Sequence, residues 1–333
     1  MEDTPLTVER PEISAVIVSW NAKDFLLDCL RSIKGCGAGK SIEIIVVDNA
    51  STDGSPEAVE REFPGVKLIR NETNKGFAAA NNIGIEQSTG KYICLINSDV
   101  WVLENCLDRL CDYMDSNPSI GMVGPKILNP DMTLQVSCRR FPGLWNNFCP
   151  AFGLSRVFGE TQFFGGEHMF FFKHDVVRRV NVLVGCFLMV RRVALDDVGL
   201  LDERFFMYVE DIDWCRRFWA AGWEVVFFPD AQAIHYRGGS SSNAPAKFAM
   251  EQEHAKLQYW KKYHGGLSRS AILLIIAMTH ALRIGLGVLF LLTKSPKKDS
   301  VLIGIKRHVT CLGSLFGNCF GLLPTWKIKL NKE

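Results

Sequence analysis

From residue 13 onward the chain alternates short apolar runs with segments of helical periodicity. This alternation is typical of a mostly parallel β-sheet wrapped by helices, because parallel strands need a long crossover connection, usually a helix. The predicted strands are residues 13–19, 43–47, 66–69, 92–96, 120–123, 182–191 and 224–228. The predicted helices are residues 24–33, 56–63, 77–87, 105–116 and 211–221, with Ser55 as the N-cap of the second. The sequence therefore predicts an α/β fold with a Rossmann-like, mostly parallel sheet.

Three regions depart from this alternation. Residues 1–12 are polar and acidic, so we expect an N-terminal tail there rather than a signal peptide, which needs a basic start and an apolar run. Residues 141–172 place many Phe among Gly, Pro and Asn. This composition predicts an insertion whose aromatic side chains either pack on the main core or form a surface for an apolar acceptor. We therefore expect one α/β domain over residues 13–240 and a helical, membrane-associated region over residues 241–333.

The C-terminal region differs from the rest of the chain in charge. From Lys256 to Glu333 it carries 13 Lys and Arg against two acids, a net +11, so the remainder carries −9 within the overall +2. A basic tail indicates anionic lipid or nucleic acid as a partner, and the apolar runs in it favour lipid. Residues 270–292 are long enough to cross a bilayer, although they contain His280 and Arg283.

The last apolar segment, residues 301–323, has a different pattern. Apolar side chains recur at spacings of three and four, with the polar residues largely off that stripe, which predicts a helix lying in a membrane interface. The alternative is a pair of helices docked on the core. The stripe consists of Ile305, Val309, Leu312, Phe316, Cys319 and Leu323.

The 11 cysteines are scattered along the chain, with no Cys-x-x-Cys pair and no His spacing suited to zinc. Such a distribution predicts reduced thiols in a cytosolic compartment, most of them acting as small core residues.

The loops after the predicted strands exclude two familiar nucleotide sites and one calcium site. No Gly-x-Gly-x-x-Gly follows the first strand, where residues 20–24 contain no glycine, and no Walker phosphate loop is present. Residues 49–60 nearly match a calcium loop, but a strand precedes them and Pro56 interrupts them. What remains is a set of polar residues at strand ends, where open α/β sheets bind ligands.

Two acids stand at the ends of such strands, Asp48 and Asp99. Either one alone is more often a helix cap or a turn residue. A carboxylate that follows a buried strand is costly to bury unless it is paired or bound to a cation, and two at successive strand ends favour a ligand site.

A second acidic group, Glu210, Asp211 and Asp213, lies at a predicted helix start. A helix N-terminus stabilises carboxylates, and this structural explanation suits Asp213 best. His235 follows the predicted strand 224–228 and precedes Gly-Gly, which makes it a better ligand candidate than an isolated His.

In this order and spacing the motifs resemble those of the family 2 glycosyltransferases, which are inverting enzymes of GT-A fold. The resemblance covers about residues 13–240, and within the family it is similar to bacterial rhamnosyltransferases that act on lipid-linked sugars and to galactofuranosyltransferases. Each motif alone is weak, whereas the ordered set is specific. The motifs are Ile17-Val18-Ser19-Trp20-Asn21, the segment from Val46 to Ser55, Asn74-Lys75-Gly76-Phe77-Ala78-Ala79-Ala80-Asn81, Asn97-Ser98-Asp99, the segment from Glu210 to Arg217, and His235-Tyr236.

The resemblance implies roles for particular residues. Asp48 is similar to the acid that contacts the nucleobase, Asp99 and His235 to metal ligands for Mg²⁺ or Mn²⁺, and Asp211 to the catalytic base. Asn97 stands where the fuller metal motif has an acid, which leaves one charge fewer for the cation. We expect eight further residues to line the nucleotide-sugar pocket: Ser19, Asn21, Asn74, Lys75, Gly76, Asn81, Asn97 and Ser98. On the acceptor side we expect Gly185, for which a tight strand bend is an equal explanation, together with Glu210 and Trp214.

These residues imply a metal-dependent inverting glycosyltransferase that moves L-rhamnose from dTDP-rhamnose to a polyprenyl-diphosphate-linked saccharide in cell-wall or surface-polysaccharide assembly. A UDP-sugar donor carrying galactofuranose, GlcNAc or another hexose stays open. Two readings from other classes are a nucleotidyltransferase, whose early Gly-rich loop is missing here, and an inactive membrane-anchored protein that binds nucleotide-sugars.

The expected location is the cytoplasmic face of the bacterial inner membrane, either peripheral or with one C-terminal span. We expect no nucleic-acid partner, and the sequence makes no prediction about oligomeric state.

Overall fold

The computed structural model describes residues 10–37, 39–238, 245–292 and 298–319, and they divide into two compact units. The first unit contains Met1–Cys138, His174–Asp202 and Asp211–Ser240. The second contains Arg139–Lys173, Glu203–Glu210 and Ser241–Glu333. Most of the predicted N-terminal tail, the linker at 239–244 and the chain end from residue 320 lie outside the described residues. The domain boundaries expected from the sequence stay a prediction.

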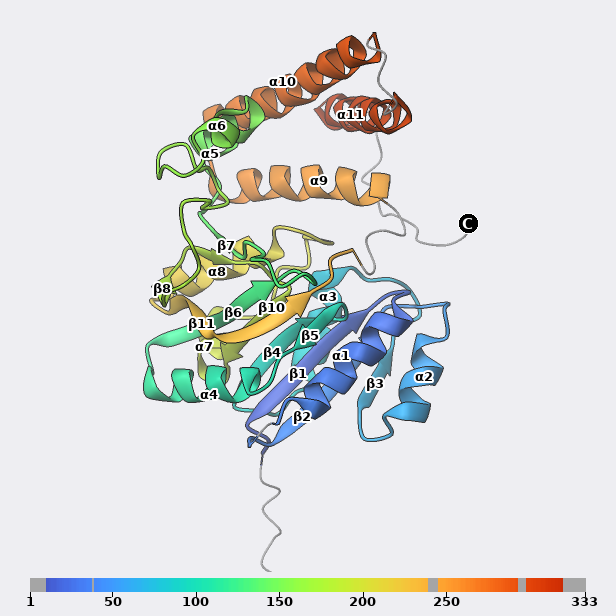
Figure 1. Cartoon of the computed structure of the whole chain (residues 1–333), viewed down its shortest axis with the longest axis vertical. Helices are drawn as coiled ribbons and strands as arrows, with labels where there is room; N and C mark the ends of the chain where they lie inside the picture. The colour runs from blue at the N-terminus through green and yellow to red at the C-terminus, as the bar shows by residue number, and fades with distance from the viewer. Residues whose placement is uncertain (1–9, 38, 239–244, 293–297, 320–333) are drawn as a thin grey trace, which may run out of the picture. The chain divides into compact units, whose positions relative to one another are not determined.

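The first unit is built on a mixed β-sheet, whose parallel half matches the predicted strands. Among the described residues nine strands form this sheet, in the order β3-β2-β1-β4-β10-β6-β11-β5 with β8 also paired to β11 (Figure 1). β1, β2, β3 and β4 run parallel, and β11 runs parallel to β6, whereas β10 is antiparallel to both β4 and β6. The strands are β1 Ile13–Ser19, β2 Ile42–Asp48, β3 Lys67–Arg70, β4 Tyr92–Asn97, β5 Val100–Val102, β6 Ile120–Leu128, β8 Arg178–Arg179, β10 Phe187–Arg191 and β11 Glu224–His235; β7 Cys138–Arg139 and β9 Val182–Leu183 lie outside this sheet.

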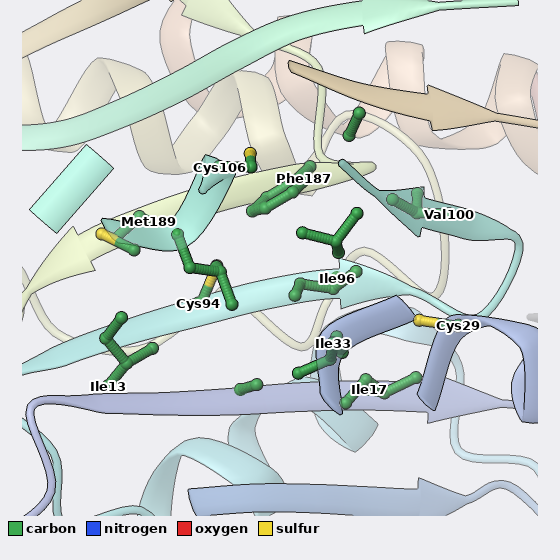
Figure 2. Close-up of a cluster of buried hydrophobic side chains, with 14 of the residues drawn as sticks. Ile13, Ile17, Cys29, Ile33, Cys94, Ile96, Val100, Cys106, Phe187 and Met189 are labelled. Atoms are coloured by element: carbon green, nitrogen blue, oxygen red, sulfur yellow. The ribbon is translucent and has the colours of Figure 1, made fainter. Parts of the chain in front are cut away.

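Helices cover both faces of the sheet. Alternate residues of β1 point to opposite faces, and the face of Ala15 and Ile17 packs against α1, α2 and α4 in one core cluster. Figure 2 shows part of this cluster, with Ile17 of β1 near Cys29 and Ile33 of α1. α3 packs on the other face, where a Cβ added at Gly84 would lie 2.3 Å from Val16 Cγ1, so this helix approaches the sheet closely because residue 84 is glycine. The helices are α1 Lys23–Gly35, α2 Ser55–Glu62, α3 Phe77–Glu86, α4 Cys106–Ser116, α7 Arg192–Val198 and α8 Glu210–Ala220.

Three details of the predicted elements are corrected by the structure. Ser55 is the first residue of α2 and not its N-cap; the cap is Gly54, whose φ of 79° suits glycine, and Ser55 Oγ donates to Asp53 Oδ1 at 2.5 Å. The predicted strand 182–191 is interrupted, leaving β9 and β10. The last strand continues to His235, because a register shift between Phe228 and Gln232 carries the chain past Pro229, which has no N–H to donate.

The second unit is helical. α10 packs against α5, α9 and α11, and it is long and apolar enough to cross a membrane. The insertion at 141–172 forms two short helices, and its rings pack on one another, with Trp145 centred 4.9 Å from Phe163. The helices are α5 Leu144–Ala151, α6 Leu154–Val157, α9 Pro245–Tyr263, α10 Gly266–Leu291 and α11 Lys298–Cys319.

The apolar stripe predicted for the last segment matches α11 only in part. Val309 is 52% exposed, whereas Cys311, which lies off the predicted stripe, is buried. The side chains of Phe316 and Cys319 and the whole of Leu323 lie outside the described residues. The ten cysteines that the structure describes are all free and buried, as small core residues would be.

Candidate active site

Three neighbouring strands of the first unit end in polar side chains. In the β1–β2 register Ser19 lies beside Asp48, and in the β1–β4 register Asn97 lies beside Val18. Within the described part of the chain, no group hydrogen-bonds to Ser19 Oγ, Asp48 Oδ1 or Asn97 Oδ1, although all three atoms are buried. Burial raises the pKa of Asp48. Buried polar atoms usually have partners, so this edge is suited to a ligand that supplies donors and a cation.

The loop before α3 is shaped by a buried asparagine that sequence analysis did not single out. Asn49 Oδ1 accepts from the main-chain N–H of Lys75 at 2.9 Å, and Asn49 Nδ2 donates to Asn74 Oδ1 at 2.9 Å. Asn74 Oδ1 also accepts from Gly76 N at 2.9 Å, and Gly76 has a φ of 87°, which favours glycine. Residues 74–76, which are predicted to bind the nucleotide-sugar, therefore form a turn that is hydrogen-bonded to Asn49.

The other predicted donor residues are placed as follows. Asn21 joins the loops after β1 and β2, because its Oδ1 accepts from Thr52 N at 2.7 Å and its N–H donates to Ser51 Oγ at 2.9 Å. Ser98 is buried at the end of β4. Asn81 is buried within α3, where Nδ2 donates to Phe77 O at 2.8 Å. The structure thus places Asn21 and Ser98 near the strand ends and ties the Asn81 amide to its own helix.

Asp99 and His235, the two predicted metal ligands, lie together. His235 Nε2 is 3.2 Å from Asp99 Oδ1, and Tyr236 N donates to Asp99 O at 3.0 Å. Burial acts to lower the pKa of His235, but the neighbouring Cys186 and Asp99 outweigh it and raise that pKa to about 10. A ring nitrogen this close to a buried carboxylate marks a place where positive charge is stabilised.

This pair fits a divalent cation that also binds a substrate. A carboxylate oxygen, an imidazole nitrogen and the unpartnered Asn97 Oδ1 are donors that Mg²⁺ and Mn²⁺ accept. In the described residues no group of three or more His, Cys, Asp or Glu is arranged to hold an ion. Sites with few protein ligands are typical of Mg²⁺ that is also bound by substrate phosphates.

Asp211 is connected to this pair through Gly185 and Cys186. The Gly185 N–H donates to Asp211 Oδ2 at 3.0 Å, and Ile212 N donates to Asp211 Oδ1 at 2.8 Å. Cys186 O accepts from the main-chain N–H of Asn97 at 2.9 Å, and Cys186 is one of the neighbours that raise the pKa of His235. One dipeptide thus joins the predicted base to the end of β4 by hydrogen bonds. Cys186 had no sequence signal beyond its neighbour Gly185.

Trp214 and Glu210, two residues predicted on the acceptor side, are both buried. Trp214 is fully buried, its Nε1 donates to Gly199 O at 2.9 Å, and its ring meets Phe218 edge to face. A ring buried in this way packs the core, so its acceptor role stays a prediction that this conformation does not support. Glu210 is buried at the first residue of α8. Asp213, the acid that helix-terminus stabilisation explains best, accepts a hydrogen bond from Arg217 Nε at 2.9 Å.

The fold defines a class, the proteins of GT-A fold. Two solved structures show that fold. Mannosyltransferase PcManGT from Pyrobaculum calidifontis, in complex with GDP-Man and Mn²⁺, matches with a TM-score of 0.56 at 15% identity, over 94% of this chain and 88% of that one. GalNAc-T7, with UDP, GalNAc and Mn²⁺, matches with a TM-score of 0.54 at 17% identity, over 74% of this chain and 48% of that one.

Sequence comparison gives the family. The model of glycosyl transferase family 2 matches residues 14–181, and the chain belongs to this family. It is also 29% identical over 282 residues to an N-acetylglucosaminyl-diphospho-decaprenol L-rhamnosyltransferase of Mycobacterium tuberculosis, a match that covers 79% of this chain and 89% of the relative. The family resemblance and GT-A fold expected from the sequence are confirmed. The protein is a glycosyltransferase, and the nucleotidyltransferase reading is set aside.

Proposed function

We propose that this glycosyltransferase moves L-rhamnose from dTDP-rhamnose, with inversion, to a polyprenyl-diphosphate-linked saccharide that contains GlcNAc. The single observation that supports the chemistry is the hydrogen-bonded link from Asp211 through Gly185 and Cys186 to Asn97, because it ties the proposed base to the strand end that precedes Asp99. The mycobacterial relative, named for rhamnose and for a lipid-linked GlcNAc, supports the donor and the acceptor. The second candidate, a UDP-sugar donor in the same site, differs only in the base and sugar bound.

Asp211 acts as the general base in this proposal. As an acceptor hydroxyl attacks the anomeric carbon, a new carbon–oxygen bond forms, the bond to the diphosphate breaks, and the hydroxyl proton passes to Asp211. Two main-chain N–H groups, from Gly185 and Ile212, fix the direction of the carboxylate, which keeps its remaining lone pairs in position for that proton. Attack from the face opposite the leaving group inverts the anomeric configuration.

Asp99 and His235 would hold Mg²⁺ or Mn²⁺, and the unpartnered Asn97 Oδ1 is a third candidate ligand. When bound, the cation neutralises charge on the departing nucleoside diphosphate. Ser19 Oγ and Asp48 Oδ1, the two buried atoms in register on β1 and β2, would pair with the nucleobase at the opposite side of the donor pocket.

The second unit would face the membrane in which a polyprenyl acceptor resides. Its exposed apolar side chains come from the insertion and from α10 and α11, and Arg269, Arg283 and Arg307 are exposed on the same helices. This combination is typical of a protein surface on anionic lipid at the cytoplasmic side. The exposed apolar residues include Trp145, Phe158, Phe163, Phe170, Leu267, Leu274, Leu286, Leu289, Leu292 and Ile303.

The donor is tested by a thermal-shift panel followed by transfer. dTDP-rhamnose, UDP-galactofuranose and UDP-GlcNAc are each added with Mn²⁺, with Mg²⁺ or with EDTA, and transfer to polyprenyl-diphosphate-GlcNAc is then measured with the anomeric configuration of the product. Ligand at about 100 times its Kd adds about 2.7 kcal/mol to the unfolding free energy, which raises Tm by several degrees. We expect this shift, and transfer, with dTDP-rhamnose and a cation.

A shift and transfer with a UDP-sugar alone would instead establish the second candidate. Binding of dTDP-rhamnose with no transfer to any acceptor would favour the inactive nucleotide-sugar-binding protein.

The membrane surface is tested by flotation with vesicles of phosphatidylcholine, with and without phosphatidylglycerol. We expect Leu286→Glu on α10 to reduce flotation with the anionic vesicles by about tenfold or more, since an inserted Leu contributes about 1.5–3 kcal/mol. Val193→Glu on α7 is the matched control, because both side chains are 56% exposed and Val193 belongs to the first unit. Extraction by alkaline carbonate would indicate a helix lying on the membrane, and resistance to it a span. Equal flotation of both variants and wild type would contradict the proposed surface.

A further inference from the structure

Gln135 is a buried glutamine of the first unit that holds the ring of His235. Gln135 Oε1 lies 2.7 Å from His235 Nδ1, and Gln135 Nε2 donates to the main-chain oxygen of His235 at 2.9 Å. The backbone of Gln135 is fixed in turn, because its N–H donates to Ile127 O at 2.9 Å. Only 5% of the residue is exposed, so water does not compete for these bonds.

The direction of the Gln135 amide follows from its other contact. Nε2 also donates to Asn129 Oδ1 at 2.9 Å, so both of its hydrogens are used by oxygen acceptors and Oε1 must face His235. Asn129 is fixed as well, since its Nδ2 donates to Thr133 Oγ1 at 2.9 Å and to Leu134 O at 3.3 Å. An exchange of oxygen and nitrogen in either amide would place donors against donors and acceptors against acceptors.

The protonation of His235 Nδ1 follows from that direction. A carboxamide oxygen can only accept, so Nδ1 must carry a hydrogen. The ring nitrogen left to face Asp99 Oδ1, 3.2 Å away, is then Nε2. A metal-binding His needs its ligating nitrogen free of a proton, and the hydrogen bond at the other nitrogen decides which one that is.

We propose that Gln135 is a positioning residue that fixes the Nδ1–H form and the orientation of the His235 ring, and so presents Nε2 to a divalent cation held with Asp99. The inference rests on the cation of the proposed function and deepens it. Gln135 touches neither the cation nor the donor; it acts through His235.

The test compares two variants of opposite chemistry by their affinity for Mn²⁺, measured by electron paramagnetic resonance of free Mn²⁺ with and without thymidine diphosphate. Gln135→Met keeps the shape and removes the acceptor, and we expect it to weaken Mn²⁺ binding about 10- to 100-fold. Gln135→Glu keeps an acceptor for Nδ1–H, although its second oxygen faces His235 O and Asn129 Oδ1, and we expect it to bind Mn²⁺ more tightly than Gln135→Met does. The exposed Gln258→Met is the control for the substitution itself.

If Gln135 only packs the interior, Gln135→Met should bind Mn²⁺ more tightly than Gln135→Glu, because Met fills a packed site well and a buried Glu charge does not. Wild-type affinity in a folded Gln135→Met variant would therefore overturn the inference. Should that variant not fold, ¹⁵N NMR of the Zn²⁺-loaded wild-type protein decides the question: we expect a protonated Nδ1 on His235, and an unprotonated Nδ1 overturns the inference. If wild type binds no Mn²⁺ in either condition, the cation of the proposed function is refuted. The inference about Gln135 is then overturned as well, because His235 would have no cation to bind.

Discussion

Adding one methyl group at Gly185 tests how finely Asp211 must be placed. A Cβ at residue 185 would lie 3.2 Å from Asp211 Cβ and 3.7 Å from Asp211 Oδ2. Carbon atoms prefer a separation of about 3.5–4.0 Å, so Asp211 would have to move by about 0.3–0.8 Å. A misplacement of 1 Å can cost about 10²-fold in rate, which scales to a loss of about 4- to 40-fold in kcat for Gly185→Ala. The backbone at Gly185 does not have a positive φ, so the substitution adds no backbone strain.

The assay for Gly185→Ala is steady-state transfer with separate determination of kcat and of KM for the donor. We expect kcat to fall and KM for the donor to stay near its wild-type value, because Asp48 and the other strand-end residues are not displaced. Gly65→Ala is the control, since a Cβ there has nothing within 4 Å. Unchanged kcat in Gly185→Ala, with a thermal stability like that of the control, would refute the argument that the position of Asp211 limits the reaction.

Three further predictions concern stability and donor binding. Gly84→Ala in α3 should destabilise the protein by about 1–3 kcal/mol in chemical denaturation, because the new Cβ would lie 2.3 Å from Val16 Cγ1; an unchanged midpoint would refute the close packing. Burial acts to raise the pKa of Glu43, but hydrogen bonds from side-chain hydroxyls and main-chain N–H groups outweigh it and lower that pKa. Glu43 therefore stabilises the fold above about pH 4.5 and loses this effect as the pH falls through its lowered pKa. In Glu43→Gln the unfolding free energy should accordingly fall less steeply as the pH is lowered below about 4.5. The same fall as in wild type would contradict this. Asp48→Asn should raise Tm of the free protein and weaken donor binding at least tenfold, as measured by calorimetry. Ser51 N must keep an oxygen acceptor, so the amide nitrogen of the variant would face the nucleobase in place of Asp48 Oδ1. Unchanged donor affinity would show that Asp48 does not line the donor pocket.

Much of the fold follows from local sequence patterns. The strands and helices from residue 13 to residue 97 lie within two residues of their predicted bounds, because their apolar periods and their polar ends are both clear. The direction of β10 was not predictable in this way, since Phe187–Arg191 has the composition of a buried strand in either orientation. The extension of β11 past Pro229 was missed because a proline usually ends a strand, and only the bulge in the pairing with β6 explains it.

The candidate site was predictable where its residues stand at strand ends. Asp48, Asp99 and His235 follow apolar runs, and their positions on one sheet edge follow from the parallel order. Gln135 was not predictable, because its role depends on contacts with a residue 100 positions away and its own segment has no motif. Trp214 was expected near the acceptor from the resemblance alone, whereas packing in the core determines where its ring lies.

The most direct test of the whole account is transfer by Asp211→Asn. The substitution keeps the shape of the side chain and an oxygen that can accept from Gly185 N, but removes the base. With dTDP-rhamnose, a divalent cation and polyprenyl-diphosphate-GlcNAc, we predict a loss of about 10²- to 10⁴-fold in kcat, the range that a general base supplies, with an unchanged donor-induced thermal shift. Asp196→Asn, the same change at an exposed carboxylate on α7, should transfer like wild type. Wild-type transfer by a folded Asp211→Asn variant would contradict the account.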